Sequence, residues 1–484
     1  MSIVGEEEWM EEVKRELTLK NKPYKASPCI FSASTALLKE YKDAYVPQIV
    51  SIGPYHFRKE HLRGMETFKS EAARRQVVRI QSALSYPQFN FEQVIEKIRW
   101  REEDIKRCYD KGTPLRGEVL LWMVARDACF ILEFFRNHLS GLQDDDIFCR
   151  YDYVFRPMYH PIFGPQSENP GVKSAIMKDL IKLDNQIPLF ILHDVLDMEM
   201  RDSRSELDKL LRKVFDKFYY RPFEFCAQGE SPRQDHILDI YHYFCLGVVA
   251  SGNKNEVKLN VCCSCFTGSD GGQSSCFGCA PQQSENLQNP SQSKEWRVKV
   301  PSAVQLKNGG VKFKANGKNV VDIRFQGKTL TLPSLKLDVD SEIYIGNLVA
   351  LENSSPYYKS KSMTSYIKFM YELCKTEKGV DVMREEGVLA GNLWQHSDAV
   401  RVFSLCKQSP LSRSQDLFEK TRRKLIKYCN RKFWTAAAIL WNEFCNAYGS
   451  KPWLVVGGFG ATIVLCLTAI QVFCLFKHCG PRST

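Results

Sequence analysis

The sequence contains none of the short motifs that carry familiar catalytic chemistry. There is no His-Glu-x-x-His zinc motif, no Gly-x-Ser-x-Gly nucleophile turn and no phosphate-binding loop. Histidine is scarce, with nine residues in 484, and His236 and His242 are six positions apart, the wrong spacing for one face of a helix. The sequence therefore gives no indication of the zinc proteases, serine hydrolases or P-loop nucleoside triphosphatases that those motifs define.

The N-terminus also lacks a secretory signal. Five of the first 12 residues are Glu, whereas a signal peptide has a basic start followed by an apolar core. The 18 cysteines lack the even spacing of a disulfide framework, and the one glycosylation sequon is Asn353-Ser354-Ser355. We therefore expect most of the chain in a reducing compartment, the cytosol.

A concentrated basic patch is missing as well. The net charge of +11 is modest for 484 residues, and no large basic cluster is interleaved with aromatic side chains that would stack on bases. We therefore expect no nucleic-acid partner, and the charge suits an anionic membrane surface better.

One apolar run near the C-terminus is long enough to span a membrane. Residues 453–476 carry no charge, and Gln471 is their single strongly polar side chain. At about 1.5 Å per residue this run exceeds the roughly 30 Å of a hydrocarbon core. We predict one transmembrane helix over 452–476 with a tail at 477–484, in the plasma membrane, with the bilayer as partner. Gly457 and Ala461 give it a small-residue face, so a homo-oligomer through this helix is a further expectation.

The rest of the chain is predicted to be mainly helical, an α+β fold with a small antiparallel sheet. We expect an N-terminal extension at 1–29 with a short helix at 6–20, a helical region at 30–249, a flexible insertion at 250–297, and a sheet with further helices at 298–447. Helices are expected at 60–84, 91–109, 116–139, 173–199, 204–216, 234–248, 340–352, 362–376, 380–388, 396–407 and 412–447, and strands at 298–300, 311–313, 321–325 and 330–332.

The segment Gly53-Pro54-Tyr55-His56 allows two interpretations. His56 and Glu66 would suit a catalytic base and its partner. The simpler interpretation, which we favour, is a buried turn fixed against the helix that follows Met65, with Glu66 and Lys69 paired three residues apart.

Asp127 and Glu133 lie within a strongly apolar helical pattern. Buried carboxylates are costly unless they are paired. One interpretation is an enzyme site near Asp127, Glu133 and Asn185. The favoured one is a polar network with Arg126, or with Asn185 and Gln186, whose amides would fill a helix kink at Pro188.

A cluster of cysteines lies in the predicted insertion, at Cys262, Cys263, Cys265, Cys276 and Cys279. Four of these thiols, Cys263, Cys265, Cys276 and Cys279, have spacings that would suit a tetrahedral zinc ion. The simpler expectation is a set of exposed cysteines without a cofactor. Residues 412–447 are both basic and aromatic, so they are either a helix lying on anionic lipid or a domain helix with solvated charges.

Six blocks of the sequence, in order, resemble one family. They are YVPQIVSIGPYHFRKEHLRGMETFK (45–69), ARDACFILEFF (125–135), KDLIKLDNQIPLFIL (178–192), PSAVQLKNGGVKFK (301–314), TSYIKFM (364–370) and the apolar run with its PWLVV start (452–476). The pattern is similar to that of the plant domain of unknown function 247 family. Asp184, Ala128 and Ser32 depart from it without breaking the match.

The resemblance implies a membrane-anchored plant protein with no established catalytic activity. Some grass members are linked to self-incompatibility, so it implies a role in recognition between cells. We therefore predict a membrane-anchored, non-enzymatic interaction or signalling protein with an unknown protein partner. The alternatives are a membrane-anchored enzyme at the Asp127 site and an extracellular ectodomain glycosylated at Asn353.

Overall fold

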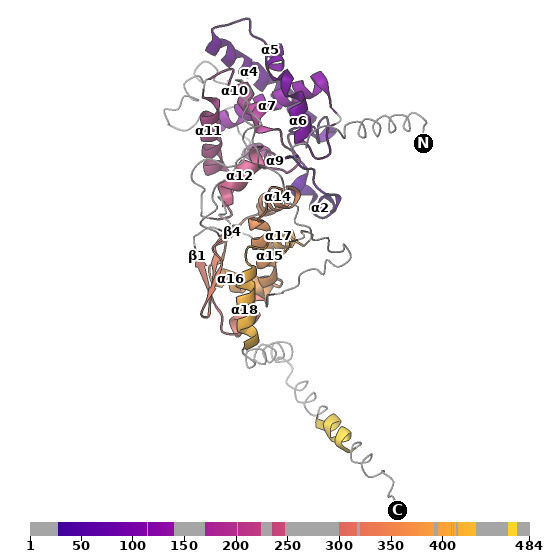
Figure 1. Cartoon of the computed structure of the whole chain (residues 1–484), viewed down its shortest axis with the longest axis vertical. Coiled ribbons are helices and arrows are strands. Elements are labelled where there is room, and N and C mark those ends of the chain that lie inside the picture. Colours follow the sequence, from indigo (N-terminus) through magenta and orange to yellow (C-terminus); the bar gives the residue numbers. More distant parts are fainter. Residues whose placement is uncertain are drawn as a thin grey trace, which may run out of the picture.

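The structure is a computed structural model. It describes residues 28–113, 115–139, 170–200, 202–223, 235–246, 300–316, 320–391, 395–407, 409, 411–412, 415–431 and 463–471. In Figure 1 the helices of the N-terminal half lie at one end of the long axis, and the strands with the helix α18 (Glu419–Arg431) lie towards the other.

The N-terminal half is built from helices around one central helix, α7 (Gly117–Leu139). Its side chains are buried on most faces, as the strongly apolar pattern predicts. α4, α5, α10 and α11 pack against it. The other helices of this half are shorter. The bounds are α2 (Thr35–Glu40), α3 (Lys42–Tyr45), η2 (Glu60–Met65), α4 (Glu66–Leu84), α5 (Phe91–Ile98), η3 (Arg99–Arg101), α6 (Glu102–Cys108), α9 (Pro170–Asp179), α10 (Leu189–Leu196), α11 (Ser203–Phe218) and α12 (Ile237–Leu246).

The C-terminal half places short strands beside a second group of helices. A capping box between Ser302 and Gln305 starts its first helix, because each side chain satisfies a free backbone amide of the other residue. The bounds are α13 (Ala303–Asn308), β1 (Lys312–Asn316), β2 (Arg324–Gln326), β3 (Thr329–Pro333), β4 (Leu335–Leu337), α14 (Ser341–Ser354), α15 (Ser362–Leu373), α16 (Glu377–Glu385), β5 (Leu389–Gly391), α17 (His396–Ser404) and α18 (Glu419–Arg431). Each predicted helical segment among the described residues contains a helix, but two predictions are wrong in extent: the segment 173–199 forms two helices separated by residues 180–188, and α18 starts at Glu419 and not at residue 412. The short helix predicted at 6–20 lies outside the described residues.

The sheet is mixed, and the prediction of an antiparallel sheet is wrong. β2 and β3 form an antiparallel hairpin through the Gln326-Gly327 turn, with Gly327 at φ of +61°. β1 pairs with the other edge of β3 and runs parallel to it, which gives a mixed three-stranded sheet, and β4 and β5 form a separate parallel pair. Adjacent strands along the chain therefore do not always pair, which the pattern of short strands could not reveal. Val300, predicted to end a strand, belongs to none.

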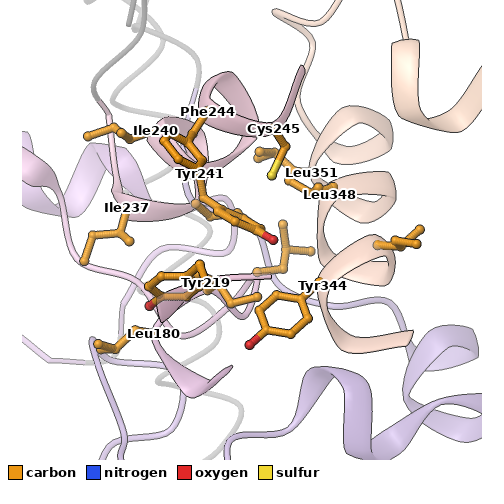
Figure 2. Packing of buried hydrophobic residues seen from close by; sticks show 14 of the residues in the cluster. Leu180, Tyr219, Ile237, Ile240, Tyr241, Phe244, Cys245, Tyr344, Leu348 and Leu351 are labelled. Atoms are coloured by element: carbon orange, nitrogen blue, oxygen red, sulfur yellow. The ribbon is translucent and has the colours of Figure 1, made fainter. Parts of the chain in front are cut away.

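One hydrophobic core joins the two halves. Tyr219 and Tyr241 meet Tyr344 of α14, with ring centroids 6.4 and 6.0 Å apart, and Figure 2 shows these rings between α12 and α14. Polar contacts reinforce this junction, because Tyr45 donates to the carbonyl of Gly346 at 3.1 Å. The N-terminal half and the C-terminal half are thus packed against each other through one shared core.

The described part of the 412–447 segment is a domain helix. In α18 the side chains of Arg422 and Leu425 are buried, and the helix packs against β2. Lys424 and Lys427 lie on its exposed face. The apolar stripe therefore points into the protein. Residues 432–447 lie outside the described residues.

The predicted membrane helix lies mostly outside the described residues. Of 452–476, the structure describes 463–471, which are helical with exposed side chains. Among the residues described, no helix is both long and apolar enough to cross a bilayer. Gly457 and Ala461 are not among them.

Candidate functional site: a buried polar network

The residues of the predicted turn and of the predicted polar network, called the signature residues below, gather around residues 46–56 and the helices that these residues contact. Three consecutive backbone amides, of Gln48, Ile49 and Val50, donate to the carboxylate of Asp179 at 2.7–3.0 Å. Asp179 ends α9, where the helix dipole disfavours a negative charge. These amides, with the ammonium of Lys182 at 3.2 Å, offset that cost.

Lys182 fixes the start of the same segment. Its ammonium donates to the carbonyls of Val46 at 2.5 Å and Asp43 at 3.2 Å. Burial lowers the pKa of this lysine, although Asp179 partly opposes the shift. The lysine is therefore a structural cation enclosed by acceptors.

Asn185 and Gln186 satisfy backbone groups at the end of α9. Asn185 accepts from the amide of Ile52 at 2.6 Å and donates to the carbonyls of Val50 and Asp179. Gln186 donates to the carbonyls of Leu180 and Lys182, both at 2.8 Å. As predicted, the side-chain amides of Asn185 and Gln186 donate to backbone carbonyls. These carbonyls lie at and just after the C-terminus of α9, however, and not at a kink within one helix. Pro188 is the residue before α10, so the predicted kink within one helix is wrong.

Gly53 provides the closest backbone approach in the network. Its φ is +77°, and a Cβ at this position would lie 2.3 Å from the carbonyl oxygen of Gln186. Its amide donates to Asp127 at 2.9 Å. The hydroxyl of Tyr109 donates to the same Gln186 carbonyl at 3.1 Å. Glycine is therefore required at position 53 because a side chain there would clash with the backbone at Gln186.

Asp127 pairs with a buried lysine. The ammonium of Lys69 lies 2.8 Å from Asp127 and 3.0 Å from Glu66, and it also donates to Ser51. Both members of the Lys69–Asp127 pair are only 1% exposed. Burial raises the pKa of Asp127 even beside this cation. The predicted pairing of Glu66 with Lys69 is confirmed, whereas Arg126 pairs with Glu66 and not with Asp127.

Glu133 lies in a more strongly cationic setting. It pairs with Arg79 at 2.9 Å and with Arg75 at 3.2 Å. Burial alone would raise its pKa, but the guanidinium groups of Arg79, Arg136 and Arg75, with the Asn137 amide, lower it. Two carboxylates of one helix therefore have pKa values shifted in opposite directions, because one has a single cation and the other has three.

His56 pairs with Asp184, and the alternative of a His56–Glu66 dyad is not what the structure shows. The His56 Nε2 atom lies 2.8 Å from Asp184, and Lys59 Nζ lies 2.7 Å from Nδ1. Tyr55 donates to Asp110 at 2.5 Å. Met65 is buried just before α4. These side chains thus contact other parts of the fold and help to hold it together.

Comparison with known proteins places the chain in a family. Residues 30–467 match the family model described as plant protein of unknown function, domain of unknown function 247. The chain belongs to this family. The UPF0481 protein At3g02645 of Arabidopsis thaliana is 25% identical, covering 92% of this chain and 90% of that protein. The UPF0481 protein At3g47200 of the same plant is 23% identical, covering 92% and 86%. No solved structure matches.

The network of this family member offers little for catalysis. Asp127, Glu133, Asn185 and His56 are all buried, and each has a partner. A catalytic acid or base must reach a substrate, whereas these groups hold backbone and helices in place. Among the described residues, no group of three or more Cys, His, Asp and Glu side chains is arranged to bind a metal. The four cysteines proposed for zinc lie outside them.

A second polar cluster was missed from the sequence. Glu352 accepts from the amides of Met363 and Thr364 at the start of α15, at 2.9 and 2.8 Å, and pairs with His242 at 2.9 Å. Asn347 accepts from the amide of Leu183 at 2.8 Å, which connects α14 to the α9–α10 connection. The sequence does show Glu352 and Asn347 as polar residues within an apolar helical pattern. Their partners could not be identified from the sequence, because His242 and Leu183 lie more than 100 positions away.

Proposed function

We propose that this family member is a membrane-tethered interaction protein whose folded part binds another protein and performs no catalysis. The described residues between positions 28 and 431 are called the head below. The observation that carries the proposal is that the head's buried charged groups pair with one another and with backbone groups. Because the signature residues are engaged in buried hydrogen bonds and ion pairs, they make the head rigid, and a rigid head is suited to present a fixed surface to a partner.

The tether would be the apolar run at 452–476, in the plasma membrane. α18 leads towards this run and exposes Lys420, Arg423, Lys424 and Lys427 on one face, opposite the buried Leu425. Cations close to a bilayer are attracted to the anionic lipids of the cytoplasmic leaflet, by about 1 kcal/mol each. This face supports an orientation with the head in the cytosol.

The partner would meet the head at the end opposite the tether. In Figure 1 α4 and α5 lie at one end and α18 at the other. Trp100, in the η3 turn that follows α5, is 65% exposed, with the Arg101 guanidinium 3.8 Å from its ring centre. Trp122 is 40% exposed on α7 and contacts Phe91 of α5. Tryptophan held in place at a surface is typical of protein-binding sites.

The biological setting of such binding would be recognition between cells, of which self-incompatibility is one form. This step is supported by the resemblance of the six sequence blocks alone. The proposal therefore commits to a protein partner, and the tests below address the tether and the binding surface separately.

The tether is tested by fractionation of the tagged full chain from plant cells. The full chain should stay in membranes through an alkaline carbonate wash, and a variant ending at residue 451 should be released. Release of the full chain by carbonate would contradict the tether.

The binding surface is tested by quantitative co-purification in the same cells. The Trp100→Ala, Trp122→Ala double variant should lose a protein that the natural chain retains. Tyr357→Ala is the matched control, because Tyr357 is an exposed aromatic residue elsewhere on the head, at 48%. Recovery of the same proteins by all three chains would overturn the proposed surface.

A further inference from the structure

Two cysteines distant in sequence lie in register at the edge of the helical half. The amides of Cys29 and Ile30 both donate to the carbonyl of Cys108, at 3.0 and 2.8 Å. In return, the amide of Asp110 donates to the carbonyl of Ile30 at 3.0 Å. Ile30 and Tyr109 thus form a parallel bridge. Cys29 and Cys108 each precede a bridge residue, so they lie opposite one another on the same side.

The spacing suits a covalent bond between the two sulfur atoms. Adjacent paired backbones lie about 4.8 Å apart, within the roughly 4.4–6.8 Å between Cα atoms that a disulfide spans. The Cys108 side chain contributes to the raised pKa of the Cys29 thiol, and both cysteines are free. A disulfide would therefore need rotation of side chains and little movement of backbone.

The two thiols differ in access. Cys108 is partly exposed, and its sulfur also lies 3.3 Å from the carbonyl of Asp104. Cys29 is buried, and the Cys108 side chain together with this burial raises its pKa well above the usual range. An oxidant from solvent would therefore reach Cys108 first, with Cys29 positioned to react second.

We propose that Cys29 and Cys108 are a reversible dithiol site that forms an intramolecular disulfide under oxidising conditions. With hydrogen peroxide, the Cys108 sulfur attacks one peroxide oxygen, the O–O bond breaks, and water leaves as sulfenic acid forms. The Cys29 sulfur then attacks the Cys108 sulfur, and the hydroxyl leaves as a second water with the Cys29 proton. The two thiols are oxidised, the peroxide is reduced, and a cellular dithiol reductant restores both thiols by exchange.

The bond would fasten the first described segment to the end of α6. The carbonyl of Cys29 also accepts from His236 at 2.9 Å, and Tyr109 next to Cys108 donates to the carbonyl of Gln186. The disulfide would therefore close a long loop beside the signature network and stabilise it. This inference does not depend on the proposed protein partner.

The test is thiol mapping on the purified full chain. The protein is treated with hydrogen peroxide, blocked with N-ethylmaleimide, digested and analysed by mass spectrometry, with and without later dithiothreitol. We expect a peptide containing Cys29 linked to one containing Cys108, lighter by two hydrogen atoms and separated by the reductant. The melting temperature of the oxidised chain should exceed that of the reduced chain.

Two variants make the result specific. Cys29→Ser should abolish the link and leave Cys108 as sulfenic acid or blocked thiol, whereas Cys374→Ser, at another buried cysteine, should leave the link unchanged. If Cys29→Ser does not fold, the mapping of the natural chain decides alone. Separate blocking of both thiols after peroxide, or linkage of Cys29 to other cysteines, would overturn the proposal.

Discussion

Replacing Gly53 with alanine should destabilise the protein through two separable costs. The first is conformational, because a non-glycine residue in the left-handed region, here φ of +77°, costs roughly 1–2 kcal/mol. The second is steric, because the new Cβ would lie 2.3 Å from the Gln186 carbonyl oxygen and 3.3 Å from the Tyr109 hydroxyl. Moving that backbone adds about 1–3 kcal/mol. The total expected loss in the free energy of unfolding is about 2–5 kcal/mol.

Gly310 supplies the matched control for this substitution. Its φ is +81°, and nothing lies within 4 Å of a Cβ built there. Gly310→Ala therefore carries the conformational cost without the steric one. Comparison of the two variants isolates the close approach between the turn at Gly53 and the loop at Gln186.

The assay is thermal unfolding of the full chain in detergent at one scan rate, followed by tryptophan fluorescence. At roughly 2 °C per kcal/mol, the lower end of the range for domains of about 150–250 residues, Gly53→Ala should lower the melting temperature by roughly 4–10 °C. Gly310→Ala should lower it by roughly 2–4 °C. Equal losses in the two variants would refute the reasoning, because the steric contact would then contribute nothing.

Three further predictions concern charged groups. Lys69→Met leaves Asp127 buried without its cation, so unfolding should become easier by about 3–5 kcal/mol, and adding Asp127→Asn should restore part of this; a double variant no more stable than the single one would contradict the pairing. Glu133 has a lowered pKa, so it stabilises the fold above the ordinary glutamate pKa of about 4.3 and loses that effect as the pH falls. The melting-temperature loss in Glu133→Gln should therefore shrink on acidification, and a constant loss would argue against it. Burial, then Arg204, lowers the pKa of His193 to about 4 from 6.5, so its contribution is complete above pH 6.5 and lost as the pH falls towards 4. His193→Phe should flatten the pH profile of stability in that window, and an unchanged profile would count against the shift.

The sequence alone determined the features that depend on neighbouring residues. The helical periods, the capping box at Ser302, the turn at Gln326-Gly327 and the local pair of Glu66 with Lys69 all follow from spacings of a few residues. The same reasoning identified Asp127, Glu133 and Asn185 as members of a buried polar network, because polar groups in apolar helices must find partners.

Only the tertiary structure decided which partners those groups have. Asp127 binds the amide of Gly53, 74 positions away, and Asn347 binds that of Leu183, 164 positions away. Likewise, β1 pairs parallel with β3 at the edge that β2 leaves free. Pro188 precedes α10 and does not kink a longer helix, because Asn185 and Gln186 hold the loop before it. Local sequence specifies that a buried charge or strand edge must be satisfied, but packing of distant segments selects the group that satisfies it.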